Sequence, residues 1–118
     1  MEIEEFEKLV DNAISALPVK FKTAIDNVSV VVEVWPNRNI ARGHLLLGLY
    51  QGVPKTVWGR SQGQLVPDKI TIYMGPIIYL ARGDKDRIAQ MVADTVEHEI
   101  AHHFGISDRR IDEIKKGG

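Results

Sequence analysis

The sequence contains no cysteine and no long apolar run. Without cysteine the chain has no disulfide bond, no thiolate ligand for zinc and no thiol nucleophile. No apolar stretch approaches the roughly 18 residues of a membrane-spanning helix. The acidic segment 1–7 has no basic region followed by an apolar run, so it does not resemble a signal peptide. We therefore expect a cytoplasmic protein that does not bind membranes.

Neither sign of charge is in clear excess. The chain has 15 Lys and Arg residues and 16 Asp and Glu residues, which gives a net charge of −1. Because there is no basic excess, nucleic acid is not an expected partner. With 118 residues, of which 44% are hydrophobic and 26% charged, the composition predicts one globular domain over residues 1–118.

The order of the hydrophobic patterns predicts an α+β fold. Apolar residues recur at helical spacing in some segments, and β-branched residues dominate or alternate in others. The predicted elements are, in order, helix 2–16, strands 28–35, 45–50 and 68–74, short helix 77–81, helix 85–104 and final helix 108–116. We expect a small, mostly antiparallel sheet packed on the N-terminal helix and on helix 85–104. The loop 54–68 is either functional or a plain connection.

Helix 85–104 starts after Asp84, a residue suited to cap it, and ends in the motif HExxHxxGxxD over residues 98–108. On a helix, His98 and His102 lie about 40° apart around the axis and one turn apart along it. Two imidazoles can therefore occupy two corners of a tetrahedral zinc site. Gly105 permits a turn out of the helix, and Asp108 follows three residues later as a candidate third ligand. Asp112 and Glu113 are substitutes for it if the final helix folds back.

Glu99 follows the first histidine and is placed to reach a zinc-bound water rather than the metal. Three protein ligands and one water define a catalytic zinc site. Zinc lowers the pKa of such a water to about 7 and polarises a carbonyl group. Glu99 would accept the proton of the water as a general base and pass it to the leaving amine. The predicted reaction is amide hydrolysis.

Other polar residues have both a functional and a structural interpretation. His103 points about 100° away from His102, which favours packing or contact with the helix dipole over substrate binding. Asp94, one turn before His98, either orients a ligand imidazole or is simply solvated. The same choice, between contact with substrate and packing or solvation, applies to Tyr73, Tyr79 and Arg60. His44 lies far from the motif in sequence and is expected to be structural.

The motif at residues 98–108 resembles that of the minimal-zincin family, small bacterial zinc metallopeptidases with an MMP-like domain. Segments 47–54 (LGLYQGVP) and 70–77 (ITIYMGPI) resemble other segments of that family in the same order. The resemblance covers roughly residues 28–113. It implies a minimal zincin-like fold, one Zn²⁺ per chain, and a peptide or protein substrate bound along the edge of the strand that ends near Met74.

By the same resemblance, His98, His102 and Asp108 would be the metal ligands and Glu99 the catalytic acid and base. One departure from the metzincins is clear: Met1, Met74 and Met91 all precede Asp108, so the methionine turn that follows the third ligand there is absent. Ten residues follow Asp108, which leaves little chain for a lower wall of a substrate pocket.

Two alternatives to a peptidase therefore stay open. One is a catalytically silent zinc module that binds peptides or proteins. The other is a metal-dependent nuclease, because some RNA-processing metalloproteins have a similar HxxxHxxGxD spacing. Glu99, which those proteins lack, and the absence of a basic patch argue against the nuclease. The sequence assigns no oligomeric state.

Overall fold

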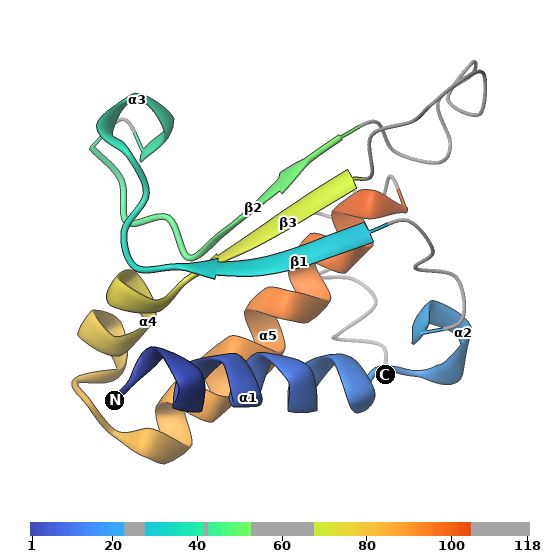
Figure 1. The fold of residues 1–118 in the computed structure, drawn as a ribbon, viewed down its shortest axis with the longest axis horizontal. Helices are drawn as coiled ribbons and strands as arrows, with labels where there is room; N and C mark the ends of the chain where they lie inside the picture. Colours follow the sequence, from blue (N-terminus) through green and yellow to red (C-terminus); the bar gives the residue numbers. More distant parts are fainter. Residues whose placement is uncertain (23–27, 42, 53–67, 105–118) are drawn as a thin grey trace, which may run out of the picture.

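The computed structural model describes residues 1–22, 28–41, 43–52 and 68–104. In this part of the chain, helices cover one face of a three-stranded sheet (Figure 1). The elements are α1 (Ile3–Ser15), α2 (Val19–Lys22), β1 (Val28–Glu33), α3 (Arg38–Ala41), β2 (Gly48–Gln51), β3 (Asp68–Tyr73), α4 (Met74–Ala81) and α5 (Lys85–His103). None of these helices is long and apolar enough to cross a membrane.

The sheet is mixed, with the strand order β1-β3-β2. β1 and β3 run parallel, with Val28 opposite Asp68, whereas β2 and β3 run antiparallel, with Gly48 opposite Ile72. The predicted α+β fold is confirmed. The expected antiparallel pairing applies only to β2 and β3. The chain reverses direction twice between β1 and β3, so these two strands point the same way.

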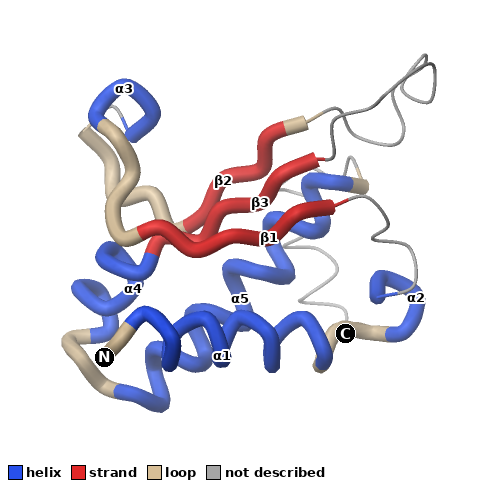
Figure 2. The backbone as a smooth tube through the Cα atoms, viewed as in Figure 1, coloured by secondary structure: helices blue, strands red, loops and turns tan. Residues whose placement is uncertain are grey.

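β3 is the central strand of the sheet, with a neighbour on each side. The prediction that the strand ending near Met74 supplies a free edge for substrate is therefore wrong. Two long-range pairings fill both of its edges, and neither can be read from the alternation of apolar residues within β3 itself. The edge strand that packs beside α5 is β2. Figure 2 shows β2 and β1 on the two sides of β3.

The hydrophobic core lies between the sheet and helices α1, α4 and α5 (Figure 1). Its residues recur at intervals of four along α1 and α5, as the helical periodicity of the sequence predicts. The buried core residues are Phe6, Val10, Leu17, Ile70, Ile72, Ile77, Ala81, Ile88, Val92, Val96 and Ile100. The core therefore holds α5 by one face along its length, up to the motif at its C-terminal end.

Asp84 caps the start of α5, as predicted. Its Oδ1 accepts hydrogen bonds from the backbone N–H groups of Asp86 at 3.0 Å and Arg87 at 3.2 Å. These two groups have no partner within the helix, so the cap satisfies them. The predicted cap at Gly105 and the final helix 108–116 lie outside the described residues.

We expect Asp84→Ala to lower the free energy of unfolding by about 1 kcal/mol, because two N–H groups of α5 lose their acceptor. Asp84→Asn is the matched control, since its side-chain oxygen caps equally well. Urea unfolding of both variants measures the difference. Equal loss of stability in the two variants would contradict a capping role for this side chain.

Candidate metal centre

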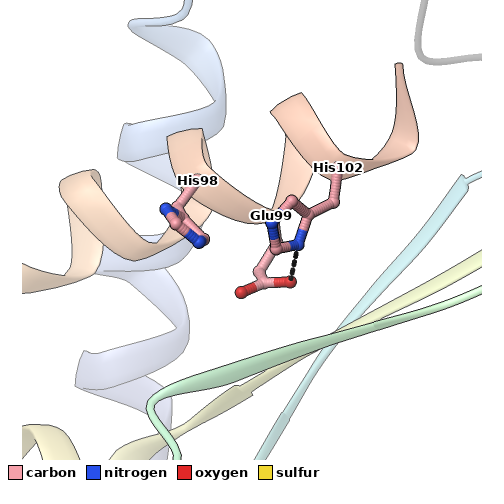
Figure 3. Close-up of side chains that lie close together, drawn as sticks. All are labelled: His98, Glu99 and His102. Carbon is pink, nitrogen blue, oxygen red and sulfur yellow. Dashed lines mark ion pairs between the residues drawn. The ribbon is translucent and has the colours of Figure 1, made fainter. Parts of the chain in front are cut away.

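Three residues of the motif come together near the C-terminal end of α5 (Figure 3). One possible ligand atom from each of His98, Glu99 and His102 lies within 4.8 Å of the other two. The two imidazole rings have centroids 4.6 Å apart and planes inclined at 68°. This proximity is what a spacing of four residues on a helix predicts.

The three side chains differ in their exposure. The side chain of His102 is 31% exposed and that of Glu99 is 8% exposed. Glu99 points from α5 toward the sheet, and its Oε1 lies 3.3 Å from Nδ1 of His102 (Figure 3). His98 is also partly exposed. Solvent therefore reaches both imidazoles, whereas the carboxylate of Glu99 is nearly buried.

The two imidazoles in this cluster fit a zinc ion. Imidazole nitrogen is an ordinary zinc ligand, the chain offers no thiolate that would compete with it, and Glu99 places a carboxylate beside the pair. The predicted third ligand, Asp108, lies outside the described residues, as do its possible substitutes Asp112 and Glu113. Zinc ligation by Asp108 therefore stays a prediction.

A cleft of about 340 Å³ opens beside this cluster. One wall is the start of β2 with the residues before it, and the other wall is α5. The lining residues are Leu46, Leu47, Gly48, Asp94, Thr95, His98 and Glu99. Because two motif residues line the cleft, a molecule bound in it would contact the candidate metal centre directly.

Gly48 allows β2 to lie close against α5 at this point. A Cβ atom at residue 48 would lie 2.8 Å from Cγ2 of Thr95 and 3.1 Å from Cγ of Glu99. Any side chain there would push the strand away from the helix. In the sequence, a glycine inside a predicted strand is the available signal for such a close approach, although it does not identify the partner.

A buried polar network anchors the C-terminal end of α5. Nδ1 of His103 lies 2.7 Å from Oδ2 of Asp68, and the hydroxyl of Tyr50 donates to the same oxygen at 2.7 Å. His103 is 0% exposed and Asp68 is 1% exposed. The carboxylate of Asp68 thus connects β2, β3 and α5. Its contact on α5 is His103, the residue that follows His102. The structural role predicted for His103 agrees with these contacts.

Sequence reasoning did not identify Asp68 as part of this network. An aspartate at the start of a strand ordinarily faces solvent, and its partner His103 is 35 residues away. The only local signal is the position of His103 on the helix, about 100° from the ligand face, which predicts a buried environment but no particular partner.

The other candidates lie in different surroundings. Tyr73 is 2% exposed, and burial, with a smaller contribution from Glu33, raises the pKa of its phenol. Tyr79 is 66% exposed on α4. His44 is also exposed, and Arg60 lies outside the described residues, as does most of the 54–68 loop. Within the described part of the chain, Asp94 is the one additional candidate that lines the cleft.

Comparison with protein-family models gives a match to the family described as zincin-like metallopeptidase, over residues 25–118. The matched region contains all three described strands, α5 and the whole motif 98–108. A search of curated proteins finds no match to the chain.

We expect Asp68→Ala to lower the free energy of unfolding by about 3 kcal/mol, because it removes the shared partner of a buried imidazole and a phenol. Tyr50→Phe, which removes one hydrogen bond to Asp68, is the milder comparison and should cost about 1 kcal/mol. Urea unfolding measures both. If Asp68→Ala costs no more than Tyr50→Phe, the network does not anchor α5.

Proposed function

The chain belongs to the zincin-like metallopeptidase family, and on this premise we propose that it is a zinc-dependent hydrolase that cleaves peptide bonds. The observation that carries the proposal is the cluster of His98, Glu99 and His102 on one helix beside an open cleft. Such a cluster supplies both the ligands for a metal and a carboxylate next to them. The cleft gives a substrate access to both.

In this proposal His98 and His102 bind zinc through their imidazoles, and Asp108 supplies the third ligand. Bound zinc supplies Lewis acidity, which lowers the pKa of water and polarises a carbonyl group. The Asp68 network holds the turn of α5 that carries His102, so it positions one ligand without contacting the metal or the substrate.

Glu99 acts as the proton carrier. Its carboxylate accepts a proton from the attacking water while the water oxygen bonds to the carbonyl carbon of the substrate. The same proton then passes from Glu99 to the amide nitrogen as the C–N bond breaks, which yields a carboxylic acid and an amine. The backbone of β2 at Gly48 lies close to the side chain of Glu99, and this close approach keeps the carboxylate beside the imidazoles.

Among the described strands β2 lies at the edge of the sheet, and it is suited to bind the substrate backbone. The backbone oxygen of Leu47 accepts a hydrogen bond from the backbone N–H of Tyr73 at 2.9 Å. In the alternating antiparallel pattern, the backbone N–H and C=O groups of Leu47 and Leu49 therefore point toward β3. The backbone groups of Gly48 then point away from β3. An extended peptide that forms hydrogen bonds with Gly48 would lie along the cleft, with a carbonyl group near His98.

We expect the zinc-loaded protein to cleave members of a random peptide library, and Glu99→Gln to lower kcat by about 10²- to 10⁴-fold because the proton carrier is lost. Zinc content, measured by atomic absorption, should be unchanged in this variant. His44→Ala, at an exposed position, is the control and should retain both zinc and activity.

Two outcomes would contradict the proposed peptidase activity. Equal cleavage by the wild-type protein and Glu99→Gln would mean that a contaminating enzyme cleaves the peptides. Tight zinc binding without cleavage of any peptide in the library would instead favour a silent module that keeps zinc for structure or peptide binding.

A separate prediction concerns the third ligand. Asp108→Ala should raise the zinc dissociation constant at least about tenfold, equivalent to 1.4 kcal/mol, because one negatively charged ligand is lost. Asp112→Ala and Glu113→Ala are matched controls that remove a carboxylate nearby in the sequence. Competition with a chromogenic chelator measures all three. A larger effect at Asp112 or Glu113 would assign the ligand to that residue instead.

A further inference from the structure

The cleft beside the candidate metal centre has one aliphatic wall and one acidic wall. Leu46 and Leu47, both partly buried, lie on the side of β2. Asp94 is exposed on α5 at the other side, one helical turn before His98. A ligand that fills this cleft therefore meets hydrocarbon and a carboxylate together.

The carboxylate of Asp94 is held in place by a neutral group. Nε2 of Gln90 donates to Oδ1 of Asp94 at 3.1 Å, and an amide does not cancel the negative charge. Glu99 adds a second carboxylate to the lining, but it lies beside His98, where the proposed zinc ion would offset its charge. Because the described lining residues include no Lys or Arg, the carboxylate of Asp94 is the group that favours a cation in this cleft.

The spacing of these groups accommodates a long side chain with a charged end. Asp94 and His98 are four residues apart on α5, which corresponds to about 6 Å along the axis. A Lys or Arg side chain has an apolar stem of three or four methylene groups and a charged end. Its stem can pack on Leu46 and Leu47 while its charge lies beside Asp94.

We propose that this cleft binds a Lys or Arg side chain of the substrate, from a residue close to the scissile bond, and that Asp94 determines this specificity. The selection of cleavage sites rests on the peptidase function proposed above. The binding of the basic side chain rests only on the cleft. An acidic side chain at the same place is disfavoured by Asp94.

Binding is tested with zinc-loaded Glu99→Gln protein, which is not expected to consume its ligand. The probes are fluorescent alanine-rich peptides in which one residue at a time is Arg, norleucine or Glu. At one position, Arg should bind about fivefold more tightly than norleucine, the gain expected of an exposed ion pair. Fluorescence anisotropy measures the dissociation constants.

Variants of Asp94 in the same background identify the residue responsible. Asp94→Asn should remove the difference between Arg and norleucine, and Asp94→Lys should make Glu the preferred residue. Asp86→Asn removes an exposed carboxylate from the first turn of the same helix, far from the cleft, and should leave the preference unchanged. A preference for Arg that persists in Asp94→Asn, or no preference at any position, overturns the proposal.

Cleavage of the same peptides by the wild-type protein separates this proposal from the peptidase itself. An Asp94-dependent preference in binding without any cleavage supports the basic-residue site and overturns the peptidase. Cleavage without a difference in kcat/KM between Arg and norleucine at any position leaves the peptidase in place and overturns the role of Asp94.

Discussion

The geometry of the candidate site depends on the hydrogen bonds of the buried carboxylate of Asp68. A buried carboxylate is costly unless hydrogen bonds satisfy it, and here one oxygen is shared by His103 and Tyr50. The three residues come from three different elements, so the network fixes the end of α5 against β2 and β3. Helix ends fray when nothing holds them, and this end carries His102. The anchor keeps that imidazole close to His98.

The residues of the candidate site come from one helix and one edge strand. α5 supplies the two imidazoles and the carboxylate, whereas β2 and the residues before it supply the opposite wall of the cleft. Gly48 is where the two meet, because only a residue without a side chain lets the strand lie so close to Glu99. Membership of the zincin-like metallopeptidase family agrees with this arrangement, and peptide hydrolysis is the function it best supports.

The described residues that line the cleft all precede the third-ligand candidate, Asp108. Leu46, Leu47 and Asp94 line this cleft together with His98 and Glu99 of the candidate metal centre. Specificity can thus arise from the strand and from the preceding turn of α5, which is why Asp94 is the residue to test.

The sequence alone predicted the features that arise from interactions between residues close together in the chain. Helical spacing brings His98 and His102 together, Asp84 caps α5 through N–H groups two and three residues away, and apolar periodicity marks the buried face of α5. Tertiary structure decided the rest: the central place of β3, the parallel pairing of β1, and the partnerships of Asp68 with His103 and of Gly48 with Glu99. These contacts join segments far apart in the chain, and their register follows from how the whole core packs. No pattern within a single helix or strand contains that information.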